Sequence, residues 1–105
     1  MAPGFHKPRA LVVDDEPDIR ELLDLTLTRM GLEVTTAEDL AGGRRELQSD
    51  DFSFCLTDMR LPDGNGLDLV TEIGEKHPNL PVAMITAHGK VEAPDAVSAA
   101  AEETA

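Results

Sequence analysis

The stretch 52–66 constrains the fold more than any other part of the chain. An apolar run rich in strand-favouring residues, 52–57, ends abruptly on the carboxylate of Asp58, and a loop with Pro62 and Gly64 follows. An apolar run bounded by turn signals in this way predicts a buried strand over 52–58. Open parallel sheets bind ligands beyond the carboxyl ends of their strands, so we expect Asp58 to lie at a ligand site.

Three further runs predict strands: 9–14, 33–37 and 81–86. The first contains four consecutive apolar residues, which indicates burial on both faces of a parallel sheet, and it ends on Asp14 and Asp15. The run 33–37 is less apolar and fits a position near the edge of the sheet. The run 81–86 is again continuously apolar, up to Thr86.

Helices are predicted between these strands. Pro17 suits the first turn of a helix that stops at Gly31. Its apolar stripe consists of Ile19, Leu22, Leu23, Thr26, Leu27 and Met30. Leu25 lies off this stripe and is either a partner-facing residue or an ordinary exposed leucine.

The remaining helices are marked by their ends. Glu38 or Asp39 can cap a second helix that runs to Ser49. A third helix ends near His77, because Pro78 blocks its continuation. The tail 91–105 is rich in Ala and Glu and favours a further helix.

Strand and helix therefore alternate, which predicts an α/β fold with a parallel sheet, right-handed crossovers and helices on both faces. If the strands that end at Asp14 and Asp58 are neighbours, the carboxylates of Asp14, Asp15 and Asp58 converge at one edge. Such like charges repel and raise one another's pKa. A hard divalent cation with oxygen ligands relieves this repulsion, and Mg²⁺ suits a site with few carboxylates, water and a phosphate. Three other acids are interpreted as ordinary surface residues: Asp50, Asp63 and Asp68.

Charge and cysteine content exclude several classes of function. The chain is one small domain of 105 residues with a formal net charge of −12, so nucleic acid and anionic membranes are not expected as direct partners. Its single cysteine, Cys55, cannot form an internal disulfide and is interpreted as a small buried hydrophobe, which fits a reducing cytoplasm. No apolar run approaches the roughly 20 residues that span a bilayer. The start 1–8 has no apolar core of a secretory signal.

Three motifs, at 11–16, 56–64 and 84–87, carry a family resemblance. They read LVVDDE, LTDMRLPDG and MITA, and in this order and spacing they resemble the receiver domain of bacterial response regulators. The longer stretches LTDMRLPDGNGLDLV and PVAMITAHG are similar to the NtrC-like, sigma-54-dependent activators, and especially to the regulators of type IV pilus genes. The resemblance covers about residues 9–93 and implies a flavodoxin-like sheet in the order 2-1-3-4-5.

The resemblance also implies roles for individual residues. Asp58 matches the phosphoacceptor, which takes a phosphoryl group from a sensor histidine kinase. Asp15 and Asp58 match direct Mg²⁺ ligands, Asp14 acts mainly through water, and the backbone carbonyl of Arg60 is a further ligand; Mn²⁺ can substitute. Thr86 matches the hydroxyl that moves to bond the phosphoryl group, and a neutral hydroxyl can donate such a bond.

Two neighbouring side chains have two open interpretations. Arg60 and His88 each lie two residues beyond a site residue, where they could flank the phosphoryl group and tune its hydrolysis. Simple exposure to solvent is the alternative for both.

The end of the chain departs from the family. A complete receiver has a fifth strand, a fifth helix and a Lys that pairs with the phosphoryl group, whereas the last lysine here, Lys90, does not match that position. We therefore expect a single receiver domain over 1–105, in the order 2-1-3-4, truncated after the fourth strand and the start of the fourth helix. A trimmed chain, a deliberate truncation and an altered end remain open. No output domain lies in this sequence, so DNA binding and ATPase activity are not assigned to it.

Two hypotheses of function follow. The first is a phosphorylation-dependent signalling domain of a transcription regulator, which is not an enzyme beyond self-catalysed phosphotransfer and autodephosphorylation. The alternative is an interaction module that docks a kinase without productive phosphorylation. Because a missing fifth strand would leave the outer edge of 81–86 open, a homodimer through this edge or through exchanged C-terminal elements is also expected.

Overall fold

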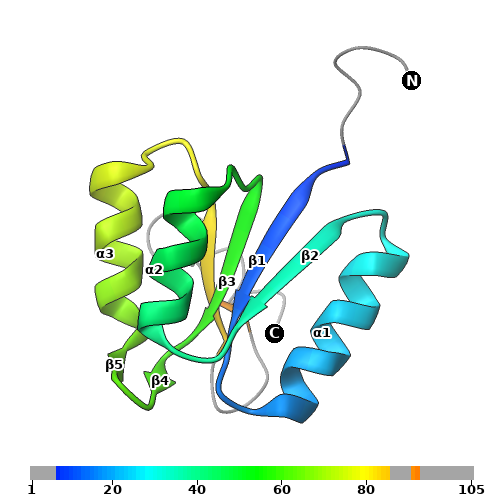
Figure 1. Cartoon of the computed structure of the whole chain (residues 1–105), viewed down its shortest axis with the longest axis horizontal. Helices are drawn as coiled ribbons and strands as arrows, with labels where there is room; N and C mark the ends of the chain where they lie inside the picture. Colours follow the sequence, from blue (N-terminus) through cyan, green and yellow to red (C-terminus); the bar gives the residue numbers. More distant parts are fainter. Residues whose placement is uncertain (1–6, 86–90, 93–105) are drawn as a thin grey trace.

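The fold is built on a single five-stranded sheet in the order β2-β1-β3-β6-β7. The computed structural model describes residues 7–85, 91 and 92. The strands are β1 (Arg9–Val13), β2 (Glu33–Ala37), β3 (Phe54–Asp58), β6 (Val82–Ile85) and β7 (Val91–Glu92). The pairs β1·β2, β1·β3 and β3·β6 are parallel. This confirms the predicted flavodoxin-like order 2-1-3-4, in which β6 is the fourth predicted strand (Figure 1).

The register of the central strands aligns their carboxyl ends. Val13 at the end of β1 pairs with Ala37 of β2 on one side and with Thr57 of β3 on the other. The residues that follow, Asp14 and Asp58, therefore leave the sheet at the same edge, as expected for neighbouring parallel strands.

Three helices cover the sheet within the described residues: α1 (Pro17–Arg29), α2 (Leu40–Ser49) and α3 (Gly66–Lys76). Helices α2 and α3 lie on one face and α1 on the other (Figure 1). Their starts follow from local chemistry: Pro17 occupies the first turn of α1, and Asp39 and Asn65 cap α2 and α3 with their side chains. In the part of the chain that the structure describes, no helix is long and apolar enough to cross a membrane.

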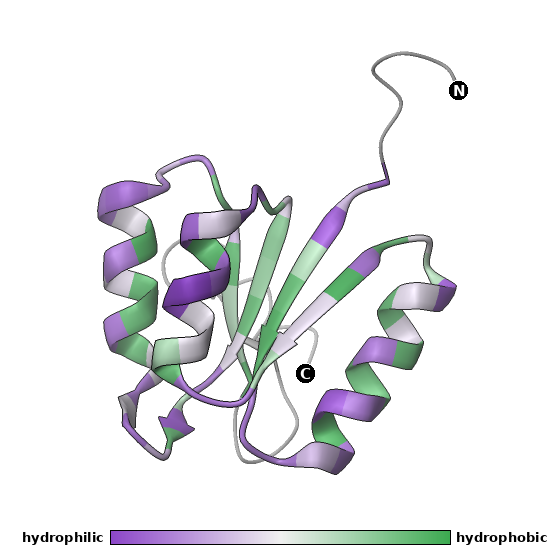
Figure 2. Cartoon of the chain, in the orientation of Figure 1, coloured by the Kyte–Doolittle hydropathy of each residue, from purple (hydrophilic) through white to green (hydrophobic). Residues whose placement is uncertain are grey.

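Strand β1 is buried from Ala10 to Val13 and separates two hydrophobic clusters. Leu11 and Val13 point to the α2/α3 side and pack with Leu69, whereas Ala10 and Val12 belong to the cluster that contains Leu27 of α1. The strands are mainly green, apart from the hydrophilic starts of β1 and β2 and the pale middle of β2, and the helices alternate apolar and polar surface (Figure 2). The prediction that β1 is buried on both faces is thus confirmed.

The predicted stripe of α1 is only partly buried. Leu27 is its one buried member, whereas Leu22 and Met30 are 58% and 69% exposed. Helix α1 contacts β1 and β2 at one side of the sheet, so the apolar face that it can bury is narrow. Leu25, off the stripe, is 53% exposed.

Two short pairings were not predicted. The loop after Asp58 forms a small antiparallel hairpin, β4 (Arg60–Leu61) with β5 (Gly64–Asn65). Residues 91 and 92, predicted as helix, instead form β7, which pairs antiparallel with Met84 and Ile85 of β6. The outer edge of β6, predicted to be open, is therefore partly paired, because backbone groups at a sheet edge bond whatever strand is within reach.

Several predictions fall on residues outside the described ranges. These are the positions of Thr86, His88 and Lys90, and the helix beyond residue 92.

Candidate metal centre

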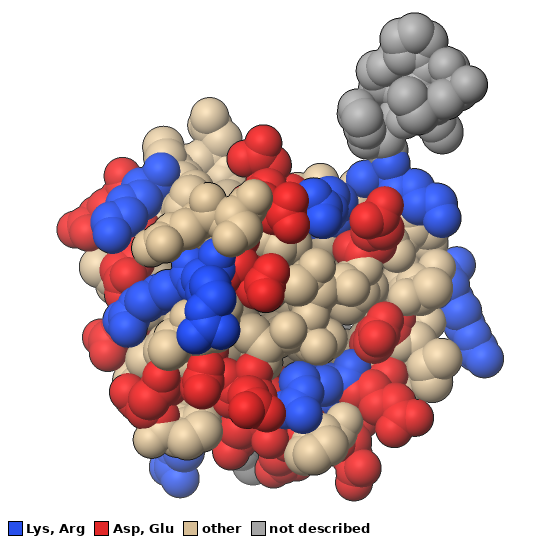
Figure 3. Space-filling model, in the orientation of Figure 1, with Lys and Arg blue, Asp and Glu red and all other residues tan. Residues whose placement is uncertain are grey.

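The three acids predicted to converge do so. Asp14 and Asp15 follow β1, and Asp58 is the last residue of β3. One carboxylate oxygen from each of the three lies within 4.8 Å of the others. Acidic side chains gather along the lower part of the molecule in Figure 3, the end at which the strands finish in Figure 1.

Asp14 is the buried member of this trio, with 3% of its surface exposed. Its carboxylate accepts a hydrogen bond from the backbone N–H of Glu16 at 2.8 Å. Burial raises the pKa of Asp14, and the charges of Asp58 and Asp15 raise it further. The fold therefore holds a carboxylate where its negative charge is unfavourable, which is the arrangement that a bound cation relieves.

The backbone of Asp58 is held on two sides. Thr57 is fully buried, and its hydroxyl donates to the carbonyl of Asp58 at 3.0 Å. Gly66, at the start of α3, lies so close that a Cβ there would collide with this carbonyl. The N–H of Gly66 also donates to the carbonyl of Met59 at 2.7 Å. Only glycine permits this close approach of α3 to the end of β3.

Arg20 contributes a cation to the same edge, which the sequence interpretation did not identify. Its guanidinium donates to the backbone carbonyl of Asp14 at 2.7 Å. The only signal in the sequence is that Arg20 follows closely on the acids, near the start of the helix at Pro17.

The other predicted site residues are placed as follows. Arg60 lies in β4, two residues after Asp58, with an exposed side chain, and it pairs with Asn65 across the hairpin. Thr86 and His88 lie outside the described residues.

Two acids that were interpreted as ordinary surface residues have structural partners. Asp50 accepts two hydrogen bonds from the guanidinium of Arg9, at 2.8 and 3.2 Å, in a bidentate ion pair. Asp63 accepts hydrogen bonds from the backbone N–H groups of Leu40 and Ala41. Neither interaction was predictable from spacing, because each joins residues more than 20 positions apart.

The donor set fits a hard divalent cation. Carboxylate oxygens are the ligands that Mg²⁺ prefers, and this site offers three of them, of which that of Asp15 is exposed to solvent. Among the described residues, no other group of three potential metal-binding side chains comes as close together.

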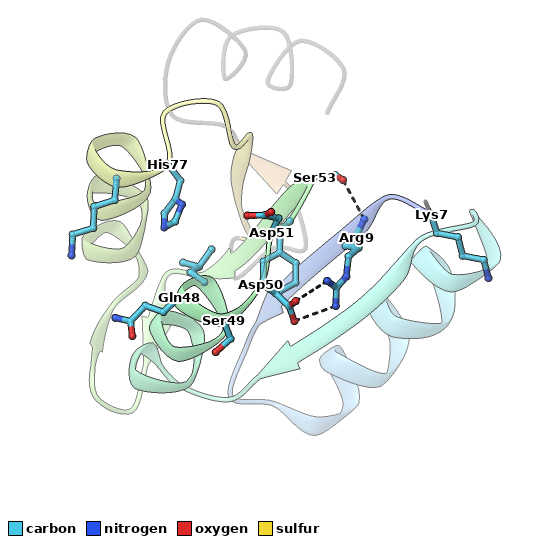
Figure 4. A pocket seen from close by; sticks show the side chains of 11 residues that line it. Lys7, Arg9, Gln48, Ser49, Asp50, Asp51, Ser53 and His77 are labelled. Atoms are coloured by element: carbon cyan, nitrogen blue, oxygen red, sulfur yellow. Dashed lines mark hydrogen bonds and ion pairs between the residues drawn. The ribbon is translucent and has the colours of Figure 1, made fainter. Parts of the chain in front are cut away.

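A hollow of about 900 Å³ lies at the opposite end of the strands. Its lining includes Arg9, Asp50 and His77, with the Arg9–Asp50 pair across it (Figure 4). Its lining residues Arg9 and Ser53 lie at the start of β1 and directly before β3, whereas the converging acids lie at the ends of these strands. We assign the candidate site to the acid trio.

Comparison with known proteins identifies the family. Residues 10–104 match the model of the response regulator receiver domain, so the chain belongs to this family of signalling domains. It is 56% identical to the response regulator protein PilR of Pseudomonas aeruginosa over 86 residues. This stretch covers 82% of this chain and 19% of that protein. It is 42% identical over 88 residues to the DNA-binding transcriptional regulator NtrC of Escherichia coli, or 84% of this chain and 18% of that protein. The resemblance to NtrC-like activators is thereby confirmed.

The chain spans about a fifth of the length of these curated relatives. Solved structures agree with the family. Response regulator protein TrrA of Thermotoga maritima, in complex with Mg(2+)-BeF, is 36% identical with a TM-score of 0.73, over 76% of this chain and 70% of that one. The chain matched in the complex of histidine kinase ThkA with TrrA is 33% identical with a TM-score of 0.74, over 90% of this chain and 79% of that one.

Proposed function

We propose that this chain is the phosphorylation switch of a response regulator, with Asp58 as the phosphoacceptor and a sensor histidine kinase as the donor. The observation that carries the proposal is the position of Asp58: it ends the central strand β3 with its carboxylate inside the acid trio. Membership of the receiver family and the similar structure in complex with Mg(2+)-BeF support the proposal.

The residues of the chain divide the chemistry among them. A carboxylate oxygen of Asp58 attacks phosphorus and forms the new P–O bond, while the bond from phosphorus to the histidine nitrogen of the donor breaks. Thr57 and Gly66 hold the Asp58 backbone, so the residue that carries the attacking carboxylate is fixed at the strand end before the donor arrives. Hydrolysis by water later returns Asp58 to its free carboxylate.

The metal site of the proposal consists of Asp15 and Asp58 as direct ligands, Asp14 through water, and the backbone carbonyl of Arg60. Bound Mg²⁺, or Mn²⁺ in its place, supplies positive charge against the incoming phosphoryl oxygens. Thr86 is proposed as the hydroxyl that bonds the phosphoryl group afterwards.

The partners of the proposal follow from the family and the relatives. They are a sensor histidine kinase, as in the complex of ThkA with TrrA, and the output domains of a longer transcription regulator in the cytoplasm. The net charge of −12 argues against direct contact with nucleic acid or an anionic membrane. We propose that residues 1–105 form a single receiver domain.

The experiment is a Phos-tag gel after incubation with acetyl phosphate and Mg²⁺. We expect a retarded band for the wild type, none for Asp58→Asn, and a retained band for Asp68→Asn as a matched control at a surface acid. Borohydride trapping and mass spectrometry then locate the label. A label on Asp15 or Asp63 with Asp58 unmodified would overturn the assignment.

The same protein distinguishes the alternative function. A chain that binds a cognate kinase in a pull-down but gives no retarded band with either the kinase or acetyl phosphate is an interaction module without productive phosphorylation.

A further inference from the structure

Asp63 joins the loop after the phosphoacceptor to a different part of the molecule. It lies between β4 and β5, and its two carboxylate oxygens accept from the backbone N–H of Leu40 at 2.8 Å and of Ala41 at 3.0 Å. These are the first two residues of α2, whose N–H groups have no partner within the helix. These bonds lower the pKa of Asp63, and the bond from Leu40 has the largest effect. The Asp63 carboxylate is therefore charged at neutral pH.

The contact between the hairpin and α2 extends beyond these two bonds. Gly64 has a φ of +153° and lies against Leu40, so that a Cβ at Gly64 would collide with the Leu40 side chain. Leu40 is buried in the same hydrophobic cluster as Leu61 of β4. The hairpin therefore docks on the start of α2 through polar and apolar contacts together.

Both ends of this contact lead back to the acid site. On the hairpin side, Arg60 pairs with Asn65, and the chain continues directly from Asp58. On the α2 side, two residues separate the helix from Ala37, whose carbonyl accepts from the N–H of Asp14 at 3.0 Å. The carboxylate of Asp63 thus closes a ring of backbone that runs from Asp14 to Asp58.

We propose that Asp63 is a positioning residue for the metal centre: by clamping the β4–β5 hairpin to the start of α2, it fixes the backbone at Arg60, whose carbonyl completes the metal site. This inference rests on the proposed function, since the Arg60 carbonyl is a ligand only there. Asp63 itself is not a ligand, because both its oxygens bond α2 and it is not part of the converging trio.

The test compares two caps of the same helix. Asp63→Ala removes the clamp, whereas Asp39→Ala removes the cap that bonds Gly42 at 2.7 Å without touching the hairpin. Mg²⁺ affinity is measured by isothermal titration calorimetry, and hydrogen exchange of the hairpin amides is measured without metal. We expect D63A to bind Mg²⁺ about tenfold more weakly, in line with the loss of groups that orient metal ligands, and to exchange faster at residues 60–65. D39A should keep the wild-type affinity and the wild-type exchange in the hairpin.

The outcomes separate the two proposals. If D63A binds Mg²⁺ as tightly as D39A and the wild type do, the clamp does not position the site. This inference is then wrong, while the proposed function stands. If the wild type binds no Mg²⁺, the metal centre itself and this inference fail together. If D63A does not fold, Asp63→Asn decides, because its amide nitrogen cannot accept from a backbone N–H and one of the two bonds to α2 is lost with the charge. We then expect weaker Mg²⁺ binding and faster exchange at residues 60–65, and wild-type values of both would overturn the clamp.

Discussion

The guanidinium of Arg20 donates to the backbone carbonyl of Asp14 at 2.7 Å, so a cation from α1 is bonded to the residue whose carboxylate is the most buried of the trio. The bond reaches the backbone and leaves the Asp14 carboxylate free of it. Arg20 therefore brings a positive charge to the acid site without occupying the carboxylate oxygens.

We predict that Arg20→Ala lowers the free energy of unfolding by about 1–2 kcal/mol, because a charged hydrogen bond is lost. Arg20→Lys keeps the charge, and its free energy of unfolding should lie between those of the wild type and Arg20→Ala. Urea denaturation in the presence of EDTA measures the effect. Equal stability of all three proteins would show that the bond is unimportant.

Metal should stabilise the folded chain by mass action. At a free Mg²⁺ concentration of about 100 times its dissociation constant, the gain is roughly 2.7 kcal/mol. Asp15→Asn should abolish most of this gain, whereas Asp68→Asn, in the first turn of α3, should leave it intact. Thermal melts with Mg²⁺ and with EDTA provide the comparison, and unchanged melts in every protein would contradict a metal centre.

Asp14→Asn should raise stability in EDTA at neutral pH. The pKa of Asp14 is raised above its ordinary value of 3.8, so the folded state holds this proton more tightly than the unfolded state. Its ionisation therefore lowers the free energy of unfolding as the pH rises from about that value through the folded pKa, and the cost is fully present above it. The advantage of the Asn variant should shrink toward acid pH. A constant difference across the titration would contradict this origin.

Cys55 should be inert to thiol reagents in the folded chain. Burial raises its pKa to about 12, and its side chain is fully buried in β3. Ellman's reagent should react with no cysteine in native buffer and with one in denaturant. Rapid reaction in native buffer would show that β3 opens readily.

The oligomeric state depends on β6. Within the described residues its outer edge is paired with β7 at Met84 and Ile85 and not at Val82 and Ala83, so we predict that the chain dimerises through the remaining edge or through exchanged C-terminal elements. Sedimentation velocity over a range of concentrations should show an association that weakens on dilution. A monomer at every concentration would show that the edge is sufficiently protected.

The converging acids were predictable because the inference needs only the ends of two buried runs and the neighbouring places that the receiver resemblance implies for these strands. The apolar residues before Asp14 and Asp58 define parallel strands, and neighbouring parallel strands finish at one edge whatever the loops do. The helix ends at Asp39 and His77 were predictable for a similar reason, since their signals are local.

The missed features depend on contacts between distant parts of the chain. The Asp63 clamp joins residues 22 and 23 positions apart, and neither its acid nor the start of α2 signals the other. Strand β7 forms because β6 offers an edge, against the helical preference of its surroundings. The exposure of Leu22 and Met30 reflects how narrowly α1 contacts the sheet, which the stripe itself does not encode.

The burial of β1 on both faces makes the interior a pair of compartments that can be redesigned separately. A change of volume at Leu27 is felt on the α1 side of the sheet, and one at Leu69 on the α2/α3 side, with the backbone of β1 as the partition between them. A cavity opened in one compartment cannot be filled by a larger side chain in the other, so compensating substitutions must be sought on the same side. Repacking one compartment should therefore leave the fit of the other unchanged, and combined changes across the partition should add.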